Sequence, residues 1–170
     1  ISIWVRMIIN IKNVLTNKKR KQLIEDCQPL LYDSDQLRRI YNPTLFYAGK
    51  QTLSNLQFKP QFQPIITYFV DIICKESGLD LELQEGKCWI NSTDGKKENI
   101  NWHVHTSDYA VVYYIKTLPF FNNGTLFRNG FIKAPQNSLL IFPAHLEHSA
   151  PTCPFQFERY TLSFNLNIVR

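Results

Sequence analysis

The hydrophobic positions of the chain change their spacing near Gly78. Before it, apolar residues recur at helical spacing over 16–31, and the segment 65–78 is apolar nearly all round. The positions in the first segment are Leu23, Ile24, Cys27, Leu30 and Leu31. This pattern predicts an amphipathic helix over 16–31 and a mostly buried helix over 65–78 that ends at the glycine. Short strands are predicted at 8–11 and 44–49.

After Gly78 the apolar residues fall in short β-forming runs separated by turn-forming residues. The runs are LELQEGKCWINS, INWHVH, YAVVYYIK, TLF, GFIK, SLLIFP and RYTLSFNLNI. Many short strands with Gly, Pro and Asn turns indicate a sandwich or barrel of the jelly-roll kind. With helices first and strands later, the fold class is predicted as α+β. We expect one domain, 1–170, with a mainly helical support region over 1–78 and a β core over 79–170.

The last run, 158–168, alternates strictly between apolar and polar residues. One face carries Tyr160, Leu162, Phe164, Leu166 and Ile168, and the other carries Arg159, Thr161, Ser163, Asn165 and Asn167. Because neighbouring residues of a strand point to opposite faces, the apolar set is expected to pack on helices. The polar set then faces either solvent or a barrel interior.

The run WHVHT places two histidines one residue apart. In a strand, His103 and His105 project from one face, where two imidazoles can chelate one divalent cation. His148, on the bend after the buried run SLLIFP, is the candidate third ligand from a distant strand, and small residues follow it. His145 competes for this role, and its alternative is a histidine at the rim.

Arg159 lies eleven residues after His148 on the polar face of the last run. A guanidinium deep in a pocket binds a carboxylate in a bidentate fork, and the hydroxyl of the neighbouring Thr161 would add one bond. The alternative is an arginine at the surface edge of a sheet.

The composition of the chain limits its possible binding partners and its cellular compartment. The chain has 170 residues and a net charge of +5, with the basic run KKRK at 18–21. No aromatic residues interleave with this run, so it is interpreted as the solvated face of a helix rather than a nucleic-acid contact. Four widely spaced cysteines, without a C-x-x-C pair, indicate reduced thiols and a cytoplasmic location. No stretch has the length of a membrane span.

Taken together, the motifs CWIN, NWHVH, AVVYY, GTLFR, LLIFPAHLEHS and ERYTLSFN resemble the iron(II)- and 2-oxoglutarate-dependent oxygenase superfamily. The likeness is greatest to a bacterial and phage branch that carries an H-x-H motif. It runs from about Tyr47 to Asn167 and is most specific in the second half. The superfamily has a double-stranded β-helix, an H-x-D/E…H iron triad and a downstream Arg or Lys for 2-oxoglutarate.

The resemblance implies a role for each matching residue. His103, His105 and His148 would be the metal ligands, with Fe(II) and 2-oxoglutarate as cofactors. Arg159 and Thr161 would hold the far carboxylate of 2-oxoglutarate. The positions expected to form pocket walls are Asn91, Tyr113 and Tyr114.

One position departs from the superfamily pattern, because His105 replaces the acidic ligand. A neutral imidazole leaves Fe(II) with its full charge, which could alter or abolish oxygen activation. Asp108, three residues further on, is a candidate substitute ligand, although its spacing on a strand or turn is awkward.

The resemblance implies an enzyme that hydroxylates a C–H bond of an amino-acid or peptidyl substrate, or another small molecule, with dioxygen. Two alternatives stay open. A three-histidine site also suits a thiol dioxygenase that needs no 2-oxoglutarate, or a zinc enzyme with an activated water. The β-helix could also be a binding or structural module without activity.

Overall fold

The computed structural model describes residues 8–41, 49–94, 102–121, 123–152 and 155–170. Its strands form a six-stranded sheet in the order β1-β7-β4-β9-β3-β2 and a three-stranded sheet in the order β6-β5-β8. The strands are β1 (Ile9–Ile11), β2 (Lys50–Gln51), β3 (Leu81–Asp94), β4 (Tyr109–Lys116), β5 (Gly124–Phe127), β6 (Gly130–Lys133), β7 (Leu139–Pro143), β8 (His148–Ser149) and β9 (Glu158–Ile168). All the ladders within these sheets are antiparallel, as in the predicted jelly roll.

In the described residues, three α-helices precede the long strands. They are α1 (Asn17–Cys27), α2 (Ser34–Ile40) and α3 (Gln63–Ser77), and single 3₁₀ turns cover Gln28–Leu30 and Leu56–Phe58. The predicted helix over 16–31 is therefore shorter, since Pro29 lies in the 3₁₀ turn that follows Cys27. The second predicted helix agrees closely and ends at Gly78, whose φ of 70° is the left-handed conformation that glycine adopts easily.

Helix α2 was not predicted, although its start carries a clear local signal. The Asp33 side chain accepts from the Gln36 N–H, and the Gln36 side chain accepts from the Asp33 N–H. This reciprocal pair is a capping box, which satisfies backbone donors at a helix start.

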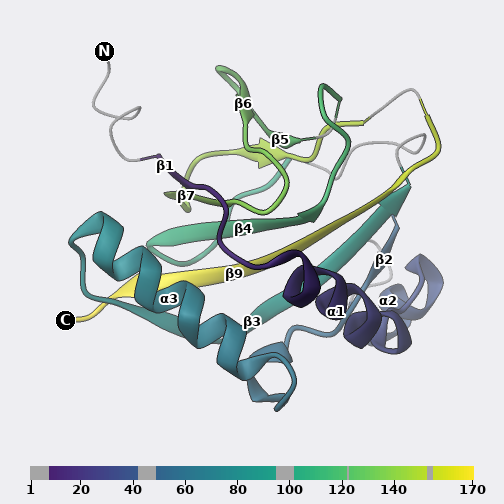
Figure 1. Ribbon diagram of the computed structural model, residues 1–170, viewed down its shortest axis with the longest axis horizontal. Helices are drawn as coiled ribbons and strands as arrows, with labels where there is room; N and C mark the ends of the chain where they lie inside the picture. Colours follow the sequence, from purple (N-terminus) through teal and green to yellow (C-terminus); the bar gives the residue numbers. More distant parts are fainter. Residues whose placement is uncertain (1–7, 42–48, 95–101, 122, 153–154) are drawn as a thin grey trace.

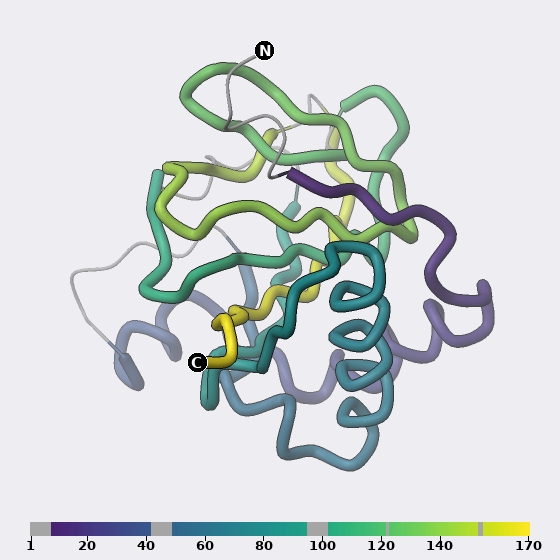
Figure 2. The backbone as a smooth tube through the Cα atoms, turned by 90° about the vertical axis from the view of Figure 1, so that its left-hand side faces the viewer, coloured from purple at the N-terminus to yellow at the C-terminus, as the bar shows by residue number. Residues whose placement is uncertain are grey.

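The helices cover one face of the six-stranded sheet, as Figure 1 shows for α3 and α1. Phe69 of α3 is fully buried against the sheet, with its ring centroid 4.6 Å from that of Tyr113 on β4 and 6.4 Å from that of Phe164 on β9. In the turned view of Figure 2, α3 and the β5–β6 hairpin lie at opposite ends of the molecule. The six-stranded sheet thus has helices on one face and the smaller sheet on the other.

Strand β9 confirms the alternation predicted from the sequence. Its apolar residues from Tyr160 to Leu166 belong to the core under the helices. Its polar residues from Arg159 to Asn165 line a cavity on the opposite face. Ladder pairing fixes this alternation over the whole strand, because β9 lies between β3 and β4.

Two of the predicted strands fall largely or partly outside the described residues. The segment 44–49 falls almost wholly outside the described residues. The run INWHVH does not form a ladder in its described part, 102–105; His103 makes one isolated bridge, to His148. Backbone pairing nevertheless continues, because the His105 N–H donates to the Ala144 carbonyl at 3.0 Å.

The basic run at 18–21 lies on α1, as expected for a helix surface. Lys18, Lys19 and Lys21 are exposed, whereas Arg20 is buried and donates through Nη1 to the Ile115 carbonyl at 2.9 Å. None of the helices in the described part of the chain is both long enough and apolar enough to cross a membrane.

Candidate metal centre

A cavity of about 430 Å³ lies on the face of the six-stranded sheet that the helices leave open. Strand β3 contributes Trp89, Asn91 and Thr93, and β9 contributes Arg159, Thr161, Ser163 and Asn165. On the far side, the cavity is lined by His103, His105 and His148. The predicted metal ligands and the predicted carboxylate-binding residues therefore open into one space.

The three imidazoles come together from two segments that are distant in sequence. His103 and His148 pair across a bridge, with backbone N–H to carbonyl distances of 3.1 and 3.0 Å. One ligand atom from each of the three side chains lies within 4.8 Å of the other two. The Nε2 atoms of His105 and His148 are 3.2 Å apart. Two nitrogens bound side by side to one metal at about 2.1 Å would be about 3 Å apart, so this pair has a suitable spacing.

His148 is oriented for ligation by its own backbone loop. Its Nδ1 lies 2.9 Å from the Leu146 carbonyl, and since a carbonyl only accepts, Nδ1 carries the hydrogen. In the neutral ring, Nε2 then carries the lone pair, and this atom faces His105. Phe142 packs edge-on against the ring, with centroids 4.7 Å apart, and holds its plane. A hydrogen bond from the remote ring nitrogen to a carbonyl is common among metal-binding histidines.

The imidazoles of His105 and His148 are both neutral at pH 7. Burial lowers the pKa of His105 to about 3, helped by the positive charge of the two neighbouring histidines and of Lys87. Burial, and the charge of His103, lower the pKa of His148 to about 4. Neutral imidazole is the form that binds transition metals, so the set fits a divalent metal such as Fe(II).

Arg159 and Thr161 lie at the closed end of the cavity, each only 3% exposed. The guanidinium donates to the Gly124 carbonyl at 3.0 Å and lies 5.5 Å from the centroid of the Tyr114 ring. Burial lowers the pKa of Arg159, but an arginine side chain stays protonated in proteins. A carboxylate in this cavity would therefore meet a charged, desolvated donor fork.

The other residues predicted as pocket walls lie in different places. Asn91 lines the cavity, directly across the ladder from Thr161. Tyr114 shares that face of the sheet, but it is fully buried behind the cavity, and its hydroxyl lies 2.5 Å from Thr125 Oγ1. Tyr113 points the opposite way, so its assignment to the pocket wall is wrong. Its ring packs on the helices, and its hydroxyl donates to Asn137 Oδ1 at 2.6 Å.

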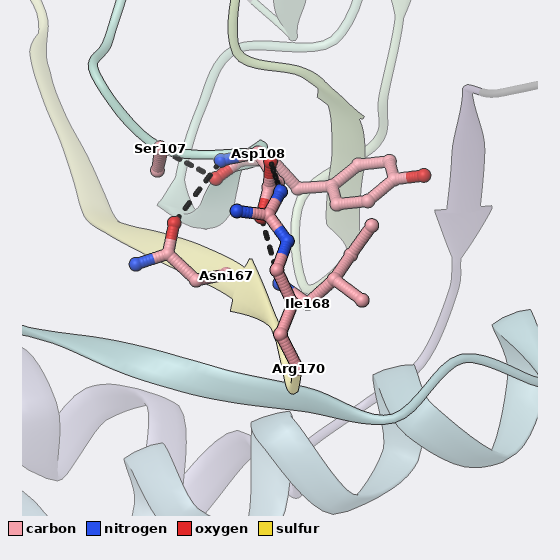
Figure 3. Close-up of polar contacts among 6 residues, drawn as sticks. Ser107, Asp108, Asn167, Ile168 and Arg170 are labelled. Atoms are coloured by element: carbon pink, nitrogen blue, oxygen red, sulfur yellow. Dashed lines mark hydrogen bonds and ion pairs between the residues drawn. The ribbon is translucent and has the colours of Figure 1, made fainter.

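The structure turns Asp108 away from the histidines. Its carboxylate accepts from the Ile168 N–H at 2.9 Å and from Arg170 at 3.1 Å, as Figure 3 shows. Asp108 is not part of the metal-binding group and does not line the cavity. His145 is exposed and also lies outside the group of three histidines.

The positive charge of the cavity was not predicted from the sequence. Lys50 and Lys87 line it together with Arg159, and no described lining residue is acidic. Lys87 lies in an irregular stretch of β3, where the ladder with β9 shifts between Leu83 and Cys88. Gly86 in this stretch has a φ of 69°, and such bulges redirect neighbouring side chains. The glycine was a local signal, but the direction of the lysine depends on long-range pairing.

Comparisons with known proteins identify the fold. No protein-family model matches the sequence, and no curated protein sequence matches it. Among solved structures, the fold is similar to the viral collagen prolyl hydroxylase of Paramecium Bursaria Chlorella virus-1, with a TM-score of 0.65 and 11% identity over 96% of this chain and 90% of that chain. It is similar to HygX of Streptomyces hygroscopicus, crystallised with nickel, 2-oxoglutarate and hygromycin B, with a TM-score of 0.69 and 10% identity over 98% and 85%.

A third similar structure is SnoN, a non-haem α-ketoglutarate-dependent epimerase from nogalamycin biosynthesis. Its TM-score is 0.71, at 10% identity, over 97% of this chain and 80% of that chain. The identities are low, and the agreement is one of backbone architecture. The chain therefore shares the fold of these three structures, one of which was crystallised with nickel and 2-oxoglutarate and another of which is an α-ketoglutarate-dependent epimerase.

Proposed function

We propose that the protein is an iron(II)- and 2-oxoglutarate-dependent oxygenase that hydroxylates a C–H bond. One observation carries the proposal: three imidazoles and a buried guanidinium open into the same cavity. A metal site alone gives no role to Arg159, whose buried guanidinium lines the same cavity. A ligand that binds a metal at one end and carries a carboxylate at the other accounts for both features, and 2-oxoglutarate is such a ligand.

Each residue has a distinct role in this proposal. His103, His105 and His148 would hold Fe(II), and Arg159 with Thr161 would bind the far carboxylate of 2-oxoglutarate. Bound iron and 2-oxoglutarate supply the oxidising chemistry, in which dioxygen, 2-oxoglutarate and R–H become succinate, carbon dioxide and R–OH. The chain supplies the residues that would position the iron, the 2-oxoglutarate and the substrate in one cavity.

Residues that pack around Arg159 and His148 support these roles. Tyr114 lies beneath the guanidinium, and burial raises the pKa of its hydroxyl to about 12, so the hydroxyl keeps its proton. It is hydrogen-bonded to Thr125, which also lines the cavity. Phe127 and Phe142 pack around His148 and exclude water from that side of the metal ligands.

The positive charge of the cavity favours a substrate with a negative charge. Lys87, Trp89, Asn91 and Thr93 alternate along β3 and line the cavity in that order, and Thr93 pairs with Arg159. Lys87 is therefore at the end away from Arg159, about 20 Å along the strand. With 2-oxoglutarate at Arg159, this lysine would neutralise an acidic group of the substrate. We therefore propose an amino-acid or peptidyl substrate with a free carboxylate. We also propose that the protein is cytoplasmic, because the three free cysteines among the described residues would stay reduced there.

Turnover of 2-oxoglutarate tests the proposal. The protein is reconstituted with Fe(II) and ascorbate, and succinate and oxygen uptake are measured with and without 2-oxoglutarate. We expect oxygen uptake that depends on 2-oxoglutarate and forms one succinate per dioxygen. Folded, iron-loaded protein that forms no succinate above the iron-free background would refute the oxygenase.

The substrate class is tested in the same assay. N-acetyl amino acids are compared with their primary amides, and the acids should raise succinate formation more. The variant Lys87→Gln should reduce the difference. Equal stimulation by acids and amides would refute the acidic substrate and leave the oxygenase unaffected.

A second function has one observation in its favour. No carboxylate lines the described part of the cavity, and the candidate ligands among the described residues are three imidazoles. Such a site also suits a thiol dioxygenase, or a zinc enzyme, in which Arg159 would bind the substrate carboxylate directly. Oxygen uptake without 2-oxoglutarate, stimulated by a small thiol carboxylate such as cysteine, would favour the dioxygenase.

A further inference from the structure

Arg128 connects the two chain segments that carry His103 and His148. Its Nε donates to Glu147 Oε2 at 2.9 Å, and its Nη2 donates to Glu147 Oε1 at 2.8 Å, so the pair is bidentate. Its Cζ also lies 4.1 Å from the centroid of the Trp102 ring. Trp102 immediately precedes His103, and Glu147 immediately precedes His148. One guanidinium therefore contacts the residue next to each of these two histidines.

Strand pairing explains why the three side chains meet. Phe127 of β5 pairs with His148 of β8, so the next residue, Arg128, lies opposite Glu147. His103 and His148 direct their rings into the cavity. Neighbouring residues of an extended chain point the opposite way, so Trp102 and Glu147 are on the outer side of the same backbone. The Arg128 contacts, called the outer clamp below, lie behind the two histidines.

Backbone pairing alone holds this part of the site weakly. Strand β8 has two residues, and His103 is joined to it by one isolated bridge. The long ladders of β3, β4 and β9 lie on the opposite side of the cavity. Metal ligands must be held within about 0.5 Å of their working positions. Side-chain contacts between these short segments therefore have a larger effect on ligand geometry than they would within a long ladder.

We propose that Arg128 is a positioning residue that sets the separation of His103 and His148 for metal binding. This inference rests on the metal site of the proposed function. The Arg128 guanidinium suits the task because its planar fork binds a carboxylate with two bonds while its face covers an indole. A lysine ammonium lacks the planar fork, so it cannot make both contacts at once in this geometry.

The outer clamp contributes little to the stability of the whole fold. The side chains of Arg128 and Glu147 are 56% and 44% exposed, and exposed ion pairs of this kind are weak. Its effect is local, because it acts on two adjacent ligands. A positioning role predicts a change in metal binding with little change in the stability of the fold, whereas a general structural role predicts a loss of stability.

The test measures metal binding in Arg128→Ala and Arg128→Lys without 2-oxoglutarate or turnover. Co(II) is the probe, since its visible spectrum reports ligand geometry and a titration gives its Kd. We expect a roughly tenfold higher Kd in Arg128→Ala, as for other outer partners of metal ligands, and an altered Co(II) spectrum. Arg128→Lys should behave like the alanine variant, because it keeps the charge and loses the planar fork.

Arg170→Ala is the matched control. Arg170 also forms an exposed ion pair, with Asp108 (Figure 3), and neither residue lines the cavity. This variant should keep the wild-type Kd and spectrum, with a Tm like that of the Arg128 variants. Wild-type Kd and spectrum in Arg128→Ala, or full rescue by Arg128→Lys, would overturn the inference. Failure of the wild-type protein to bind Co(II) would instead refute the metal site itself.

Discussion

Replacing His148 with alanine is expected to weaken Fe(II) binding at least about a hundredfold. His148 is only 5% exposed, its free Nε2 faces His105 at 3.2 Å, and its Nδ1 is held by the Leu146 carbonyl. Removal of a ligand should cost more than the tenfold to roughly hundredfold loss typical of an outer partner. Anaerobic titration calorimetry with Fe(II) measures the change.

The neighbouring His145 offers a matched control. It is exposed and outside the histidine group, so His145→Ala should keep the wild-type affinity. His148→Gln keeps most of the side-chain volume against Phe142 and tests whether the loss in the alanine variant reflects packing. Equal losses in the variants at positions 145 and 148 would contradict the assignment of the ligand.

The second large effect is expected at Arg159. The variant Arg159→Met should lower the affinity for 2-oxoglutarate about a hundredfold or more and leave the affinity for Fe(II) unchanged. Truncating one partner of a buried, hydrogen-bonded charge pair costs about 2–5 kcal/mol, which corresponds to factors of about thirty to several thousand. Binding of 2-oxoglutarate to the Fe(II)-loaded protein is measured by calorimetry.

Arg159→Lys gives the necessary comparison. It keeps a positive charge at the closed end but loses the fork, so its affinity for 2-oxoglutarate should lie between those of the wild type and Arg159→Met. Melting curves of the three proteins without ligand show whether the buried core around Tyr114 is intact. Unchanged 2-oxoglutarate affinity in folded Arg159→Met would mean that the carboxylate binds elsewhere.

Local patterns predicted the parts of the fold that depend on strand alternation and helix ends. The two faces of β9 follow from its sequence, and Gly78 marks the end of α3. The spacing of His103 and His105 also indicated that both could face one cavity, and the structure brings them together with His148.

The errors and omissions arise where long-range pairing decides the outcome. Tyr113 and Tyr114 are adjacent in a β-forming run, and only the register of β4 with β9 shows which of them faces the helices. Asp108 is close to the histidines in sequence, but hydrogen bonds to the end of β9 turn it away. The outer clamp of Arg128 needs three segments to meet, and no local pattern reports that meeting.

Anaerobic titration of the protein with Fe(II) and then 2-oxoglutarate tests the central claim most directly. A ligand that chelates Fe(II) through its keto acid group gives a metal-to-ligand charge-transfer band in visible light. We predict that this band appears, saturates at one iron and one 2-oxoglutarate per chain, and needs a much higher 2-oxoglutarate concentration in Arg159→Met. Folded protein that binds Fe(II) but shows no band at saturating 2-oxoglutarate would contradict the account.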